Sequence, residues 1–266
     1  MNRVIILMYH IIDNPLASQE KKYCCTPANF EKQMRFLRTS KYVPFSLGQF
    51  VDALNGECSC PENSVVVTFD DGFDNMIDKA LPVLQKYEIP ATVFVLSDRI
   101  NDINDWMHVR GFPRRRLLSK SQLLELKDVG VCIGSHTRTH ERLTDISKDR
   151  IDDEIGSSKK ILEDILGSEV TLFAYPYGLF NEEVKAAVER AGYRAACSTR
   201  SGFNRLNIDR YALRRIEVYG TDSIRSFKRK LKYGANDVSV LYPMRYYTSR
   251  LAIRLGLRKL SQTRDL

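Results

Sequence analysis

The segment Val65-Val66-Val67-Thr68-Phe69-Asp70-Asp71-Gly72 sets five β-branched or aromatic residues directly before two aspartates and a glycine. A short apolar run bounded by polar and turn-forming residues is typical of a buried β-strand. The segment therefore predicts a strand over residues 65–69 whose C-terminal end carries two adjacent carboxylates.

Similar runs recur along the chain and alternate with amphipathic stretches. The expected strands are residues 4–9, 65–69, 91–95, 131–134, 171–175, 194–198 and 212–218. Between them, Ser119 can cap a helix over 122–129 and Asn181 can cap one over 182–191, each followed by a glycine. Repeated strand–helix units of this kind predict a mostly parallel α/β sheet.

A parallel α/β sheet can be open and doubly wound or closed into a barrel, and the absence of a phosphate-binding glycine motif distinguishes between the two. An open, doubly wound sheet of the dinucleotide-binding type would carry G-x-G-x-x-G after its first strand, and neither that pattern nor a Walker motif occurs. A closed barrel, with its site on the rim formed by the strand C-termini, is therefore favoured.

Composition indicates a globular domain followed by a basic extension. Of the 266 residues, 43% are apolar and 28% charged, and the net charge is +8. The positive excess lies near the C-terminus, so we expect a barrel over residues 1–225 and a basic, amphipathic extension over 226–266.

No export signal is predicted, because the apolar run at residues 4–9 is too short, and no stretch approaches the ~20 apolar residues that cross a bilayer. We therefore expect a cytoplasmic protein, with the inner face of the membrane as the alternative location. The six cysteines are then expected as free thiols, and Cys24-Cys25 and Cys58-x-Cys60 as loop residues, because neither pair has zinc-knuckle spacing.

Reactive residues follow several predicted strands, and three of the four histidines are among them. These residues are His10, Asp70, Asp71, His136, His140 and the turn Pro176-Tyr177-Gly178. Each group alone also fits an ordinary surface loop, but strand ends in a barrel meet at one rim. One carboxylate and two imidazoles match a catalytic metal site with positions left open, and adjacent aspartates point in different directions, so they can take different roles.

Three segments resemble the first motifs of the polysaccharide deacetylase family, carbohydrate esterase family 4. They are Thr68-Phe69-Asp70-Asp71-Gly72, Ser135-His136-Thr137-Arg138-Thr139-His140 and Phe173-Ala174-Tyr175-Pro176-Tyr177-Gly178. The resemblance implies a distorted (β/α)₇ barrel in which Asp70 is the general base. It also implies a divalent ion, usually Zn²⁺, on Asp71, His136 and His140, and an oxyanion contact from the backbone N–H of Tyr177.

Two departures from the family pattern change the expected site. Typical members of the family have their general acid, a histidine, in a late motif, but no histidine follows His140 in this chain. The opening Leu7-Met8-Tyr9-His10 instead resembles the branch of the family that acts on poly-N-acetylglucosamine, in which this histidine lies at the chain start. The resemblance therefore implies that His10 is the acid. Ala174 stands where many members have an arginine that orients the base. Arg215 is the candidate replacement, and a surface salt bridge from Arg214 or Arg215 is the equally acceptable alternative.

The predicted function is metal-dependent hydrolysis of an N-acetyl group on a sugar-containing substrate, either a glycan or a lipid-linked or nucleotide-linked intermediate. An O-acetyl esterase or other amidohydrolase using the same site, and a non-catalytic glycan-binding protein, are the alternatives.

Two further segments are assigned from their composition. The long loop 98–118 is expected to expose Arg114-Arg115-Arg116 and to place Trp106 and His108 over the rim, where they are candidates for substrate contact.

In the extension, Arg250, Arg254 and Arg258 share one face of an expected amphipathic helix. This helix either packs on the barrel or binds an anionic membrane surface, and no specific nucleic acid is expected as a partner.

Overall fold

The computed structural model describes residues 3–108, 110–237 and 239. The expected amphipathic helix around Arg250, Arg254 and Arg258 lies outside these residues.

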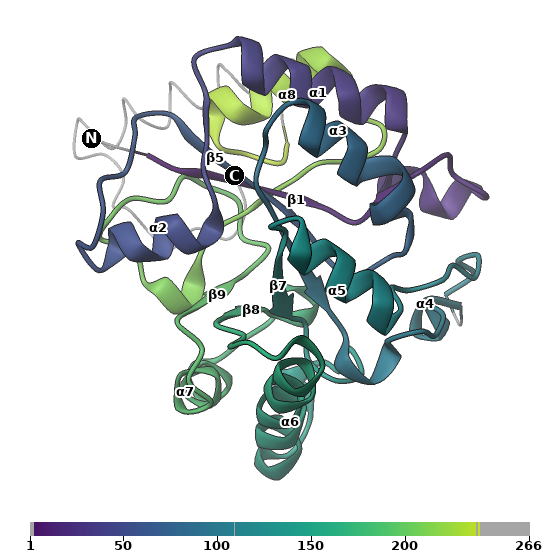
Figure 1. The fold of residues 1–266 in the computed structure, drawn as a ribbon, viewed down its shortest axis with the longest axis vertical. Helices are drawn as coiled ribbons and strands as arrows, with labels where there is room; N and C mark the ends of the chain where they lie inside the picture. Colours follow the sequence, from purple (N-terminus) through teal and green to yellow (C-terminus); the bar gives the residue numbers. More distant parts are fainter. Residues whose placement is uncertain (1–2, 109, 238, 240–266) are drawn as a thin grey trace.

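A parallel sheet forms the centre of the molecule, with helices around it (Figure 1). In order across the sheet, its strands are β10 (Ile216–Glu217), β1 (Ile5–Tyr9), β5 (Ser64–Phe69), β6 (Ala91–Val95), β7 (Cys132–Ser135), β8 (Leu172–Ala174) and β9 (Ala195–Cys197); β4 (Val43–Pro44) also pairs with β5. Each of the seven predicted strands corresponds to one of those in the main order.

The two ends of the sheet meet through the residues before β10. The backbone N–H of Leu213 donates to Ala196 at 2.9 Å, and the N–H of Ser198 donates to Leu213 at 2.8 Å. The predicted strand 212–218 is thus divided, since Leu213 pairs with β9 and Ile216–Glu217 pairs with β1. This closure confirms the barrel-like (β/α) prediction.

Alternate residues of the strands face two hydrophobic clusters. Ile5, Leu7 and Val67 belong to the cluster that packs against the surrounding helices. Ile6 and Val66 belong to a second cluster, completed by residues of helix α2 (Leu47–Leu54). Strands buried on both faces need continuous apolar runs, which explains why the strand sequences do not alternate with polar residues.

The remaining helices are α1 (Pro27–Thr39), α3 (Leu81–Lys86), α4 (Asp105–His108), α5 (Lys120–Asp128), α6 (Lys148–Leu166), α7 (Glu182–Arg190) and α8 (Ile224–Tyr233). Both predicted caps are confirmed: the side chain of Ser119 accepts a hydrogen bond from Gln122 N, and that of Asn181 accepts one from Val184 N.

Helix α8 lies beside α1 and crosses the expected boundary between residues 225 and 226 (Figure 1). Its side chains Phe227 and Leu231 are fully buried in the main core. The first part of the basic extension is therefore packed on the barrel.

All six cysteines lie among the described residues and are free thiols, as predicted. The prediction of loop positions is wrong for Cys24 and Cys25, which form the short strand β3 and pair with β2 (Ile11–Ile12). Among the described residues, no helix combines the length and apolar character that a bilayer crossing requires.

Candidate active site

The predicted site residues come together where β1, β5, β7 and β8 end. The backbone N–H of Asp70 donates to Tyr9 O at 3.0 Å, and that of His136 donates to Val95 O at 2.8 Å, so adjacent strands hold the start of each loop. Four non-glycine residues of these loops have left-handed backbone angles. They are Asp71 (φ 71°), Thr137 (φ 72°), His140 (φ 71°) and Tyr177 (φ 57°). Such conformations cost free energy and concentrate at functional sites.

Asp71, His136 and His140 form a compact set of metal ligands, with one ligand atom from each within 4.8 Å of the others. The Nε2 atoms of His136 and His140 lie 3.5 and 3.4 Å from Asp71 Oδ1. All three side chains are buried. The structure therefore brings together the three predicted ligands.

The protonation of His136 suits a metal ligand. Its Nδ1 lies 2.7 Å from the carbonyl of Ala174, which can only accept, so Nδ1 carries the proton and Nε2 presents a lone pair toward Asp71. Burial lowers the pKa of His136 to about 4, which keeps the imidazole neutral near pH 7. A neutral imidazole held through its other nitrogen is the usual arrangement at metal centres.

His140 is enclosed by aromatic rings. Trp106 stacks on it with 5.4 Å between ring centroids, and the ring of Tyr177 meets it edge-on at 4.6 Å. The Nδ1 atom of His140 is buried and has no hydrogen-bond partner in the described part of the chain. The other nitrogen, Nε2, faces Asp71, so the donor set of Asp71, His136 and His140 fits a site built to hold a divalent cation.

Asp70 is bound by the predicted arginine. Both terminal nitrogens of Arg215 donate to its carboxylate, Nη1 to Oδ1 at 2.6 Å and Nη2 to Oδ2 at 2.7 Å. Burial alone would raise the pKa of Asp70, but the charge and hydrogen bonds of Arg215 outweigh it and the pKa is lowered. The alternative of a surface salt bridge from Arg215 is wrong, because this side chain is fully buried.

His10 reaches the same rim from the end of β1, and its ring packs against Tyr23 at 5.4 Å between centroids. Burial opposes ionisation of Asp71, yet His140, His10 and His136 hold the pKa of that carboxyl well below its usual range. His10, the predicted acid, thus contributes to the electrostatic environment of the predicted ligand Asp71.

Tyr177 lies in a turn that requires the following glycine. A Cβ atom on Gly178 would collide with Thr199, and Gly178 itself has φ 68°. The N–H of Gly178 donates to Tyr175 O at 2.8 Å, closing the turn. The ring of Tyr177 is thereby directed onto His140.

Glu154, on α6, supports the histidine loop and was not predicted from the sequence. Its carboxylate accepts hydrogen bonds from the N–H groups of Arg138 and Thr139, both at 3.0 Å, and from Thr139 Oγ1 at 2.7 Å. The side chain is 1% exposed. The sequence signal that could have identified Glu154 is its position on the same helical face as Ile151 and Ile155, because a carboxylate on a buried face needs a partner.

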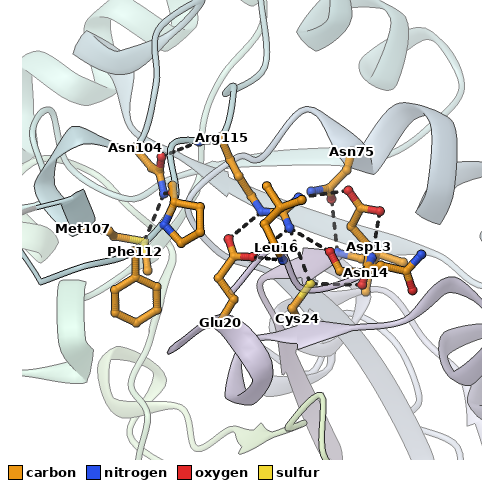
Figure 2. Close-up of polar contacts among 12 residues, drawn as sticks. Asp13, Asn14, Leu16, Glu20, Cys24, Asn75, Asn104, Met107, Phe112 and Arg115 are labelled. Atoms are coloured by element: carbon orange, nitrogen blue, oxygen red, sulfur yellow. Dashed lines mark hydrogen bonds and ion pairs between the residues drawn. The ribbon is translucent and has the colours of Figure 1, made fainter. Parts of the chain in front are cut away.

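Arg115 ties the loop 98–118 to the segment that follows His10 (Figure 2). Its Nε donates to Glu20 at 2.6 Å, and its Nη1 donates to Asp13 at 2.9 Å. The prediction that the whole arginine cluster is exposed is wrong for Arg115, which is buried, although Arg114 is exposed. The same loop carries Trp106 over His140, so this network fixes one wall of the site.

His108 does not join the site. It is exposed, and its Nδ1 lies 3.4 Å from Phe112 O. Of the two candidates for substrate contact in this loop, only Trp106 contacts a predicted metal ligand.

A (β/α) barrel with an Asp-His-His donor set and an Arg-bound carboxylate at its rim is an arrangement typical of hydrolases that use a divalent metal. Residues 59–196 match the family model described as polysaccharide deacetylase. The chain belongs to the polysaccharide deacetylase family.

Individual relatives agree with this assignment. The chain is 30% identical to YxkH of Bacillus subtilis (strain 168) over 215 residues, 80% of this chain and 70% of YxkH. It is 27% identical to the poly-beta-1,6-N-acetyl-D-glucosamine N-deacetylase of Staphylococcus epidermidis over 237 residues, 82% of this chain and 79% of that enzyme. The structure of the Streptococcus pyogenes deacetylase PplD in complex with acetate superimposes with a TM-score of 0.74 at 25% identity, covering 86% of this chain and 98% of PplD. The protein is therefore a carbohydrate deacetylase, a hydrolase that acts on a sugar-containing substrate.

Proposed function

We propose that the protein hydrolyses the N-acetyl group of a sugar unit to a free amine and acetate, with Zn²⁺ held by Asp71, His136 and His140. The observation that carries the proposal is the carboxylate of Asp70, ionised by Arg215 and adjacent in sequence to the ligand Asp71. Two imidazoles and one carboxylate form a common donor set of catalytic zinc. The relative from S. epidermidis, whose name specifies N-deacetylation, supports an amide substrate.

The proposed roles divide the chemistry between metal and protein. When bound, the divalent ion lowers the pKa of water and polarises the acetyl carbonyl. Asp70 takes the proton of the attacking water, since Arg215 keeps its carboxylate ionised and fixed in orientation. The backbone N–H of Tyr177 donates to the developing oxyanion, because donors fixed in advance are most effective in a buried site.

His10 is proposed as the general acid. An amine leaves an amide only if its nitrogen is protonated, so a second titratable group must face the substrate. His10 approaches from β1, whereas Asp70 comes from β5, so the two groups are held by different strands.

We further propose a cytoplasmic or inner-membrane-surface location and a lipid-linked or nucleotide-linked substrate. The repeat of Arg250, Arg254 and Arg258 supports an anionic surface as partner, with about 1 kcal/mol from each basic residue near such a surface. Cosedimentation of the full chain and of a chain ending at Tyr242 with anionic vesicles tests this: equal binding by the two would remove the membrane proposal.

The test of the enzymatic proposal combines metal content with acetate release from matched N-acetyl and O-acetyl sugars. We expect about one zinc per chain and preferential release from the N-acetyl substrate. His136→Ala should lose both metal and activity, whereas His108→Ala, which alters an exposed histidine outside the site, should retain both. Release from O-acetyl sugars alone would identify an esterase, and metal binding without any release would identify a glycan-binding protein.

A further inference from the structure

The histidine loop, residues 136–140, has a strained backbone between its two metal ligands. Thr137 (φ 72°) and His140 (φ 71°) both adopt left-handed backbone angles, and Thr137 is β-branched. A β-branched residue in this region is a true outlier, and the conformation costs free energy. Such a loop persists only if contacts from outside hold it, so the positions of the two histidines depend on the residues that surround the loop.

The segment after β6 holds one side of the histidine loop. The backbone N–H of Ser97 donates to Thr137 O at 3.1 Å, and that of Asp98 donates to Arg138 O at 3.2 Å. These two bonds use carbonyl groups of the loop. The buried N–H groups of the loop therefore need acceptors from elsewhere.

Glu154 supplies acceptors from the other side, on α6. Its Oε2 accepts hydrogen bonds from the consecutive N–H groups of Arg138 and Thr139, both at 3.0 Å, and its Oε1 accepts one from Thr139 Oγ1 at 2.7 Å. Consecutive N–H groups next to a left-handed residue form a concave anion site, or nest. In this protein the anion in the nest is a buried carboxylate of the chain itself.

The carboxylate of Glu154 is stabilised mainly by this loop. In the part of the chain that the structure describes, the cation within 4.0 Å of it is Arg150, whose side chain is largely exposed and lies 3.6 Å from Oε1. The oxygen that binds the two N–H groups is the other one, Oε2. Hydrogen bonds to an ionised acceptor are about twice as strong as neutral ones, so Glu154 is well suited to hold a strained loop.

We propose that Glu154 is a positioning residue that sets the affinity of the site for its divalent metal. This inference rests on the proposed metal site of Asp71, His136 and His140. Glu154 acts through the histidine loop, whose two ends carry the imidazoles with their Nε2 atoms near Asp71. Without Glu154 the loop can relax to ordinary backbone angles. Metal binding must then restore the strained conformation, which weakens the observed affinity.

The experiment loads the full chain with Zn²⁺ and titrates it with a competing chelator. We expect Glu154→Leu to weaken zinc binding by about 10–100-fold, the usual effect of removing a residue that supports metal ligands. Glu154→Gln keeps the shape and one acceptor oxygen, so it should lose less. The matched control is Glu163→Leu. Glu163 lies on the same helix and accepts from the N–H of Val170 at 3.0 Å, in the loop that follows α6, and its removal should leave zinc affinity unchanged.

Urea unfolding in excess chelator separates positioning from stability. Glu154→Leu and Glu163→Leu should both be less stable than wild type, but only the Glu154 variants should release zinc more readily. If Glu154→Leu does not fold, Glu154→Gln decides. Wild-type zinc affinity in every folded Glu154 variant, or equal weakening in Glu163→Leu, would overturn the positioning role and leave the proposed metal site intact. Failure of the wild type to hold Zn²⁺ would instead contradict that metal site, and the positioning role with it.

Discussion

Arg215 donates two hydrogen bonds to Asp70, at 2.6 and 2.7 Å, across a separation of 145 positions in the chain. A third nitrogen, Nε, donates to Ser198 O at 2.9 Å and fixes the guanidinium plane. The carboxylate of Asp70 is thus held by a group that contacts no other predicted catalytic residue, which makes Arg215 a positioning residue.

Replacement of Arg215 should separate charge from geometry. Arg215→Met leaves a buried carboxylate without its partner, so we expect a loss of about 3–5 kcal/mol in unfolding free energy and severe loss of turnover. Arg215→Lys restores the charge but not the paired hydrogen bonds, and should recover stability more than kcat. Urea unfolding and steady-state kinetics measure the two effects. Recovery of wild-type kcat in Arg215→Lys would show that the paired hydrogen bonds of Arg215 do not orient Asp70.

The two adjacent aspartates should respond differently to removal of charge. Asp70→Asn should retain the metal while acetate release falls by about 10²–10⁴, the range for loss of a general base. Asp71→Asn should lower metal occupancy and activity together, because it removes a ligand. Metal analysis after dialysis, together with acetate release, distinguishes them. Loss of metal in Asp70→Asn alone would mean that the two roles are reversed.

The strands and the ligands could both be predicted from the sequence because the ligands directly follow strands that are buried on both faces. Strands buried on both faces must be apolar, so a run such as Val65-Val66-Val67 is conspicuous, and the reactive residues follow directly after it. The N-caps Ser119 and Asn181 could also be predicted, because a helix cap depends only on residues within a few positions in the sequence.

The contacts that the sequence could not predict join distant segments. From the sequence, Arg215 was the candidate partner of the base, and a surface salt bridge from Arg214 or Arg215 was an equal alternative. Only the sheet closure around Leu213 buries Arg215 and leaves Arg214 exposed. Glu154 and Arg115 resembled surface charges because their partners lie in other loops. Short strands such as β3 are stabilised by tertiary pairing and carry little local signal.

His10 should matter in proportion to the basicity of the leaving group. An amide nitrogen must be protonated before it leaves, whereas an activated aryl ester has a good leaving group, so His10→Ala should reduce amide hydrolysis far more than ester hydrolysis. The expected loss on the amide is about 10²–10⁴ in kcat. His108→Ala is the control. Equal losses on amide and ester would assign His10 a structural role.

The last prediction concerns Arg115, whose buried network joins the loop of Trp106 to the segment after His10 (Figure 2). Glu20 is fully buried, so Arg115→Met leaves its carboxylate without a counter-charge, and we expect a loss of about 3–5 kcal/mol in unfolding free energy. The double variant Arg115→Met/Glu20→Met removes both charges and should be more stable than Arg115→Met alone. Arg114→Gln is the matched control.

The two arginines are neighbours, but the Arg114–Asp105 pair is exposed, with 3.4 Å between nitrogen and oxygen. Its loss should therefore cost no more than about 1 kcal/mol. Urea unfolding gives the free energies, and the emission of Trp106 reports whether its ring still stacks on His140. We expect this stacking to be lost in Arg115→Met and retained in Arg114→Gln. Equal destabilisation by the two single variants, or a double variant less stable than Arg115→Met, would show that the buried network does not hold this wall of the site.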